Sequence, residues 1–197
     1  GINYIIAGTE DGQFYFFDHG GNIIGKAIDG TKSHFKNPLA IDKSNSQDSK
    51  ILTTDTAGTI KNIFFNGKMA EKSTGIWSEK HFFDAKNITG DINPEWIYLD
   101  KSQLYVYNSD NTLAYNYNFG AEIVNRPQYF LSNQSTYQIG IASSKDNLLY
   151  LFNEDGSFVK GFPIEGVPNF YVGNFMNNGF RYLICGDKSN YLYVYKL

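Results

Sequence analysis

Hydrophobic and polar residues alternate along this chain in short segments that are separated by tight polar turns. Five times, an apolar segment, a polar turn and an aromatic-rich segment follow one another in the same order. Alternation with a period of two is typical of half-buried β-strands, and Gly, Asn and Asp tolerate the backbone conformations that hairpin turns need. The sequence therefore predicts antiparallel hairpins and no amphipathic helix. The five segments are YIIAGTEDGQFYFFD, KILTTDTAGTIKNIFF, EWIYLDKSQLYVYN, QIGIASSKDNLLYLFN and RYLICGDKSNYLYVYK.

These segments recur at an almost constant spacing. Equivalent positions lie 48, 42, 45 and 43 residues apart, and they are Tyr15, Ile63, Tyr105, Tyr150 and Tyr193. Such a period, with three or four short strands in it, is typical of propeller blades. The sequence predicts an all-β fold, a β-propeller of about five four-stranded antiparallel blades.

Residues 1–197 are predicted to form a single propeller domain, because this length suits one core. The repeats span approximately residues 1–30, 31–76, 77–122, 123–166 and 167–197. The first repeat lacks its leading strand and the last lacks a fourth, and the strands of the two are too many for one shared blade. Two arrangements remain: a closed ring of five blades with incomplete edges, or an arc of a larger ring whose open edges pair with another copy. We expect a fragment of a longer protein, and the chain shows no signal peptide.

Strand positions can be predicted in most detail for the third and fourth repeats. The third is expected to form strands at His81–Ala85, Trp96–Leu99, Gln103–Tyr107 and Thr112–Tyr117. The fourth is expected to form strands at Tyr129–Leu131, Gln138–Ala142, Leu148–Phe152 and Phe158–Gly161. Most of the many Tyr and Phe side chains should fill the space between blades. Those that face solvent in a cluster would suit contact with a protein or a glycan.

Composition excludes several classes of partner. The chain has 17 Lys and Arg against 20 Asp and Glu, with no basic block, which argues against nucleic acid. Its apolar runs are far shorter than the roughly 20 residues that a transmembrane helix needs, so we expect no membrane insertion. The single cysteine, Cys185, excludes an internal disulfide framework and is predicted to be a buried core residue.

The run LLYLFNEDGSFVKGFPI, from Leu148 to Ile164, resembles the end of a blade in FG-GAP and VCBS repeats. Those repeats occur in integrin-like and bacterial surface propellers. The resemblance implies a propeller from an exported or cell-surface protein, although the chain itself does not fix the compartment. WD40-like and quinoprotein-like propellers are more distant, because Gly-His and Trp-Asp pairs do not recur and Trp77 and Trp96 are isolated.

The same resemblance implies a calcium loop of the form D-x-[DN]-x-D-G-x-x-[DE] in each blade. Calcium needs six to eight oxygen ligands with several carboxylates among them. Lys50, Met176 and Tyr182 instead occupy positions where ligands should be. The remaining candidates are Asp91, Asn93 and Glu95, in a shortened loop without an Asp-Gly pair. We therefore expect degenerate blades with no metal site and no cofactor.

Catalytic motifs are absent from the sequence. His19, His34 and His81 lack metal-ligand spacing, and no G-x-S-x-G motif occurs, so we predict no catalytic residues and no enzyme. The favoured function is a non-catalytic binding or scaffold module for protein or glycan in a larger exported or cell-surface protein. The alternative is part of a propeller enzyme, either a quinoprotein-like oxidoreductase or a glycan-active enzyme. Converging Asp, Glu, His or Arg side chains at the ring centre would favour that enzyme, and a channel lined by apolar groups would favour the scaffold.

Overall fold

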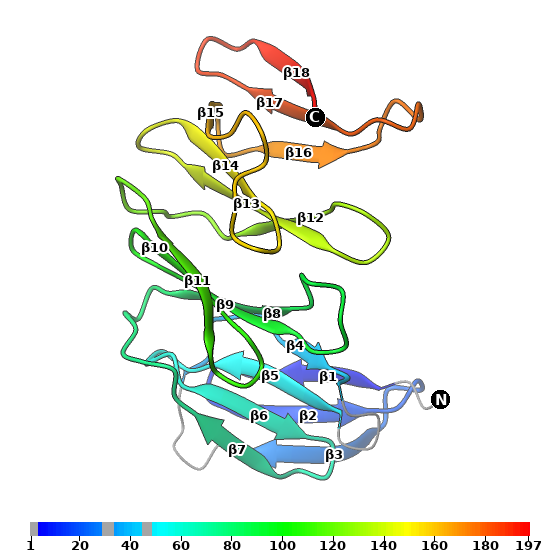
Figure 1. The fold of residues 1–197 in the computed structure, drawn as a ribbon. Helices are drawn as coiled ribbons and strands as arrows, with labels where there is room; N and C mark the ends of the chain where they lie inside the picture. The colour runs from blue at the N-terminus through cyan, green and yellow to red at the C-terminus, as the bar shows by residue number, and fades with distance from the viewer. Residues whose placement is uncertain (1–3, 29–33, 45–48) are drawn as a thin grey trace.

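The structure is a computed structural model that describes residues 4–28, 34–44 and 49–197 (Figure 1). All regular structure in these residues is β, arranged as five antiparallel sheets. The first sheet contains β1 (Ile5–Gly8), β2 (Gln13–Phe17) and β3 (Ile23–Ile28). The second contains β4 (Ala40–Asp42), β5 (Lys50–Thr54), β6 (Ile60–Phe64) and β7 (Met69–Lys72). The third contains β8 (Phe82–Lys86), β9 (Glu95–Asp100), β10 (Gln103–Tyr107) and β11 (Leu113–Asn118).

The fourth sheet contains β12 (Gln128–Leu131), β13 (Tyr137–Ser143), β14 (Leu148–Phe152) and β15 (Ile164–Glu165). The fifth contains β16 (Phe170–Gly173), β17 (Tyr182–Gly186) and β18 (Leu192–Lys196). In every sheet the strands lie in chain order, so each sheet is a meander of consecutive hairpins. This confirms the all-β prediction and the three-stranded first and last blades.

Seven of the eight strands predicted in detail are confirmed to within a residue or two, but the last strand of the fourth sheet was placed wrongly. Instead of a strand at Phe158–Gly161, Phe158 makes only an isolated bridge to Phe152, and a turn follows in which the Phe162 amide donates to the Val159 carbonyl. Gly161 has a φ of 94°, which reverses the chain. The outer strand is β15, which pairs with the start of β14. Apolar residues on both sides of this turn made the two positions hard to distinguish by pattern alone.

Adjacent sheets pack face to face through alternate side chains of their strands. Four hydrophobic clusters fill the four spaces between consecutive sheets. Between the third and fourth sheets, for example, Phe119 lies 4.9 Å from Tyr150 in an edge-to-face arrangement, ring centroid to ring centroid. Cys185 belongs to the cluster between the fourth and fifth sheets and is 1% exposed, as predicted for a core residue.

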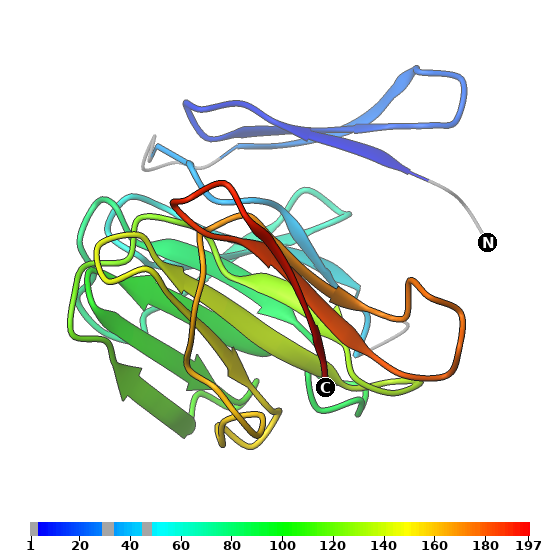
Figure 2. The same ribbon diagram turned by 90° about the horizontal axis from the view of Figure 1, so that it is seen from above.

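The five sheets form an open arc. Figure 1 places β1–β3 and β16–β18 at opposite ends of the molecule, and Figure 2 shows the first sheet as a separate layer at one side. Tyr15 lies on β2 and Tyr193 on β18, whereas the equivalent Ile63, Tyr105 and Tyr150 lie on the third strand of their sheets. The first sheet therefore lacks its innermost strand and the last its outermost strand. Of the two predicted arrangements, the open arc is the one observed.

The leading strands of the sheets line the inner side of this arc. β4 packs beside β8, and β12 packs beside β16. Polar side chains on these strands, and on the segments that enter them, are consequently brought together from different repeats. No helix in the described residues is long and apolar enough to span a membrane.

Candidate functional site

A group of polar side chains converges on the inner side of the arc from the second, third and fourth sheets. Its members come from the segments entering β4, β8 and β12, from these strands themselves and from the end of β5. We call this group the axial network, and its residues are Asn37, Thr54, His81, Asp84, Arg126 and Tyr129.

His81 stands at the centre of one half of the axial network. Its Nδ1–H donates to the Ser78 carbonyl at 2.7 Å, so Nε2 is the acceptor nitrogen. Nε2 accepts from Thr54 Oγ1 at 2.9 Å and from Asn37 Nδ2 at 3.2 Å. Burial lowers the pKa of His81, and the backbone bond to Ser78 opposes this only in part. His81 is therefore a neutral imidazole of fixed tautomer that ties the second sheet to the third.

The other half of the axial network is charged. Arg126 Nη2 donates to Asn37 Oδ1 at 2.7 Å, and Arg126 Nη1 lies 3.5 Å from Asp84 Oδ1. The Tyr129 hydroxyl donates to Asp84 Oδ2 at 2.9 Å. Burial raises the pKa of Asp84 and raises that of Tyr129 well above its usual value. Asn37, which also accepts from the Phe83 amide, joins the two halves.

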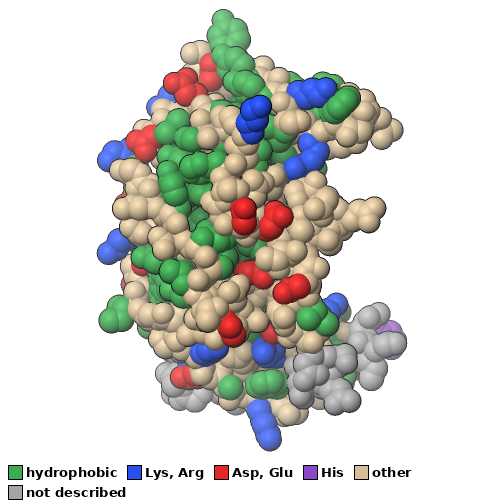
Figure 3. Space-filling model, in the orientation of Figure 1, with side chains coloured by type: hydrophobic (Ala, Val, Ile, Leu, Met, Phe, Trp, Pro, Cys, Tyr) green, Lys and Arg blue, Asp and Glu red, His purple; other side chains and the backbone are tan. Residues whose placement is uncertain are grey.

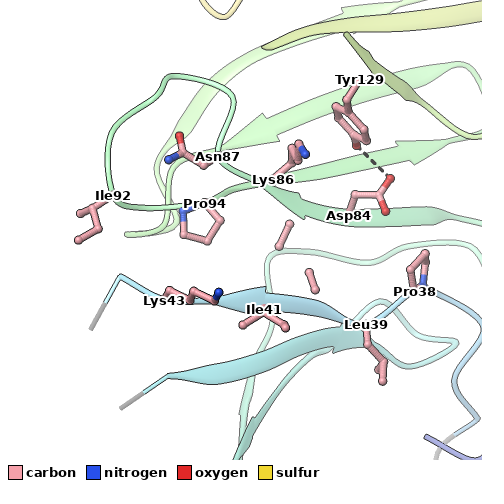
Figure 4. Close-up of a pocket in the computed structure, with 12 residues that line it drawn as sticks. Pro38, Leu39, Ile41, Lys43, Asp84, Lys86, Asn87, Ile92, Pro94 and Tyr129 are labelled. Carbon is pink, nitrogen blue, oxygen red and sulfur yellow. Dashed lines mark hydrogen bonds between the residues drawn. The ribbon is translucent and has the colours of Figure 1, made fainter. Parts of the chain in front are cut away.

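Two cavities are lined in part by members of the axial network. Figure 4 shows the first, a cleft of about 500 Å³ in which Leu39 and Ile41 lie opposite Asp84, Lys86 and Tyr129. The second, of about 720 Å³, lies where the chain enters β8 and β12, and Arg126 forms part of its wall. We call this second space the arginine cavity. Apolar walls with a few convergent polar groups are typical of ligand sites.

Replacing His81 by asparagine is expected to flatten the dependence of stability on pH below the unfolded pKa of 6.5. Because the folded-state pKa of His81 is lowered, its contribution is present above the unfolded pKa, 6.5, and is lost as the pH falls through the folded pKa. The raised pKa of Asp84 makes stability change with pH in the opposite direction. Both proteins keep Asp84, so the difference between their slopes reports His81 alone. Urea unfolding at several pH values measures the slope. Equal slopes in the two proteins would show that His81 does not titrate in this range.

The candidate metal ligands lie close together in the sequence, Asp91 and Asn93 in a turn and Glu95 at the start of β9, and they make different contacts. Asn93 donates its amide to Asp91 Oδ1 at 2.6 Å, and both residues lie at the surface turn before β9. The buried Glu95 carboxylate accepts from the Ile88 amide at 2.7 Å and from Thr89 Oγ1 at 3.0 Å. No group of three or more His, Cys, Asp or Glu in the described residues could hold a metal ion. The absence of a metal site stays a prediction.

A second candidate surface is the outer face of the last sheet. β-Pairing places Tyr171 beside Ile184 and Ile184 beside Val194, on the side away from the fourth sheet. On the same side, Leu192 is 71% exposed and Tyr171 58%. Figure 3 shows hydrophobic side chains protruding at this end of the molecule. The outer face of the first sheet is also largely apolar, with Ile5, Ala7, Tyr15, Phe17 and Ile23 on it beside Gln13 and Lys26.

Sequence reasoning placed His81 correctly at a strand start but missed the axial network. Asn37 and Arg126 are 89 residues apart, and neither belongs to a recognisable motif. The usable signal was positional: each precedes the leading strand of its repeat, as His81 does. Leading strands approach one another in a propeller, so these three positions could have been compared.

Comparison with known proteins is informative only at the level of structure. No protein-family model matches the chain, and no curated protein matches its sequence. Among solved structures, it is similar to BBS1N in a complex with ARL6DN, at 16% identity and a TM-score of 0.62. The match covers 98% of this chain and 60% of BBS1N, so the chain spans less than two thirds of that protein's length.

Two further structures are similar over the whole chain, both at 12% identity and a TM-score of 0.51. They are virginiamycin B lyase from Staphylococcus aureus, of which 70% is covered, and BamB from Moraxella catarrhalis, of which 64% is covered. At such low identity the likeness concerns the fold alone. Together with the five consecutive antiparallel sheets, it shows that the chain has a β-propeller fold in the form of an open arc.

Proposed function

We propose that the chain is a non-catalytic binding module that docks another protein's β-sheet against the apolar outer faces of its terminal sheets. The observation that carries this proposal is the outer face of β16–β18, where Tyr171, Leu192 and Val194 are 58%, 71% and 46% exposed. This face is apolar except for Lys196 at the end of β18, and such a face is typical of an interaction surface. The similarity to BBS1N, which was crystallised with a protein partner, agrees with protein binding.

The partner's chemistry follows from how the chain packs internally. Every space between consecutive sheets is filled by apolar side chains from both sides, as in the cluster of Phe14, Phe16, Ile51 and Ile63. The terminal faces present the same kind of surface without a second layer. Branched aliphatic side chains such as Ile184 and Val194 suit another sheet better than a sugar ring, so we favour protein over glycan.

We further propose that this module belongs to a longer protein whose partner sheets complete the propeller. The resemblance of residues 148–164 to FG-GAP and VCBS blades is the support for an exported or cell-surface setting. In the isolated chain, the sheet available to an open face is that of a second copy. The isolated chain is therefore expected to associate with itself.

The enzyme alternative is supported by one observation, the convergence of His81, Asp84 and Arg126 on the inner side of the arc. Thr54 and His81 even have the relation of a nucleophile to its base, at 2.9 Å. Thr54, however, is completely buried and His81 is 4% exposed. His81 lines the arginine cavity, but Thr54 lines neither cavity, so a substrate there does not reach the hydroxyl in the arrangement observed, and we favour a binding role over catalysis.

The test is sedimentation velocity of the isolated chain over a wide range of concentration. We expect reversible association that is lost in Val194→Lys, because a buried unpaired ammonium opposes packing of the two faces. Ser189→Lys, in the exposed β17–β18 turn, adds the same charge away from the face and should leave association unchanged.

A chain that stays monomeric at millimolar concentration would contradict the proposal, as would association that is equal in Val194→Lys and Ser189→Lys. Saturable binding of soluble oligosaccharides that depends on Tyr171, without self-association, would instead assign the face to glycan.

A further inference from the structure

We propose that the arginine cavity binds a carboxylate carried on an apolar body, and that Arg126 is the residue that holds it. This site is distinct from the outer faces of the terminal sheets. The proposal therefore stands or fails independently of the docking function.

The cavity walls combine positive charge with apolar surface. The lining includes Lys80, Lys101 and Arg126 against one carboxylate, Glu122, while Lys36 and Glu79 neutralise each other at 2.9 Å. Counting Asp84, which pairs with Arg126 from outside the lining, still leaves one positive charge in excess. The cavity is thus more positive than negative, which favours an anion. Its apolar lining consists of Phe82, Ile123 and Val124.

Arg126 is fixed in place before any ligand arrives. Its guanidinium carbon lies 5.1 Å from the centre of the Phe82 ring, and Nη2 is held by Asn37. Asn37 is itself held by Thr54 at 2.8 Å and by the Phe83 amide at 3.0 Å. A group whose supporting residues are already ordered loses little conformational entropy on binding.

The internal contacts do not use all of the donors of Arg126. The guanidinium has five N–H groups, and among the described residues it makes one hydrogen bond, from Nη2 to Asn37. Nη1 has no hydrogen-bond partner among the described residues, since Asp84 Oδ1 at 3.5 Å is in ion-pair range only, but Nη1 is itself buried and does not face the cavity. The side chain as a whole is 35% exposed and lines the cavity, so a ligand there would meet the remaining N–H groups, on Nε and Nη2. A planar fork with unused donors is the preferred partner of a carboxylate.

Two sources can supply this chemistry: a small free carboxylate, or the acidic side chain of a protein partner. The probes are sodium phenylacetate, with phenylacetamide as its neutral match, and a blocked Glu-Leu hexapeptide, with the Gln-Leu peptide as its match. Binding is followed by NMR, through the backbone amide signals of Phe82, Ile123 and Val124, which line the cavity and are present in every variant. We expect one of the charged probes to give a saturable shift that the neutral matches do not give.

Arg126→Gln is expected to weaken that binding at least about tenfold, because it removes a charge-assisted pair. Arg126→Lys keeps the charge but not the planar fork of donors, so its affinity should lie between those of the wild type and Arg126→Gln. Lys145→Gln, in the exposed β13–β14 turn, is the matched control and should bind like the wild type, as should Val194→Lys.

Saturation by phenylacetate assigns the site to a small carboxylate, and saturation by the Glu-Leu peptide alone assigns it to an acidic side chain; both support the proposal. Failure of both charged probes to saturate overturns it, and so does equal binding by wild type and Arg126→Gln. Should Arg126→Gln not fold, Lys80→Gln combined with Lys101→Gln replaces it, because these exposed side chains supply charge at the cavity rim. That double variant is expected to weaken binding about threefold, through the loss of long-range attraction alone.

Discussion

Replacement of Lys61 by alanine is expected to destabilise the protein by about 3–5 kcal/mol, because it leaves a buried carboxylate without its charge partner. Lys61 lies on β6 and is 1% exposed. Its Nζ is 2.6 Å from Glu71 Oε1 and 3.4 Å from Asp55 Oδ2. Asp55 is 7% exposed and also accepts the amides of Ala57 and Thr59, so it cannot turn toward water without breaking the β5–β6 turn.

The matched control is Lys36→Ala. Lys36 forms an ion pair of similar length with Glu79, at 2.9 Å, but both side chains are largely exposed, so its removal should leave the urea midpoint almost unchanged. Urea unfolding followed by tryptophan fluorescence measures both variants. Combining Lys61→Met with Asp55→Asn removes both charges and should recover part of the loss. Equal midpoints for Lys61→Ala and Lys36→Ala would show that burial does not strengthen the Lys61 contacts.

Tyr98→Ala is expected to cost about 3–5 kcal/mol, since a large buried ring leaves a cavity between the second and third sheets. Tyr98 is completely buried and stacks on Trp77 with ring centroids 4.1 Å apart. Its hydroxyl donates to the Gly58 carbonyl at 3.0 Å. Gly58 has a φ of 80°, and a Cβ there would lie 2.3 Å from the Trp77 ring, so this turn fits closely over the aromatic pair.

Tyr98→Phe separates packing from hydrogen bonding. It keeps the ring and leaves the Gly58 carbonyl without the hydroxyl, for an expected loss of about 1–3 kcal/mol. Thermal and urea unfolding of the two variants measure the difference. If Tyr98→Phe were as unstable as Tyr98→Ala, packing of the ring would contribute little to stability, and the prediction from its complete burial would be wrong.

The architecture could be predicted from the sequence because the repeat appears five times, so a strand that is unclear in one copy can be located from the others. β10 and β14 have the bounds that the alternation predicts, and the missing strands at the two ends were also anticipated. The position of β15 was not, because its two residues carry no alternation that a pattern can detect. Whether the arc closes could not be predicted either, since closure depends on the angle between sheets.

The axial network was missed for a different reason. Asn37, His81 and Arg126 meet because three sheets pack side by side, and each residue alone is an ordinary loop position. The repeat did support the expectation that the blades hold no calcium, since it identified the positions where calcium ligands would lie. Glu95, kept as a candidate ligand, holds the amides of a neighbouring turn instead.

The open arc also has a consequence for how the molecule unfolds. Each sheet packs on its neighbours in the chain, so the free energy of unfolding is close to a sum of contributions from individual sheets and from adjacent pairs. A terminal sheet has one such neighbour and an inner sheet has two. β18 is exposed along its whole length, whereas β9 and β13 are almost entirely buried. Amide hydrogen exchange should therefore be fastest at both ends of the arc and slowest in the third and fourth sheets, a gradient that a closed ring of equal blades would not have.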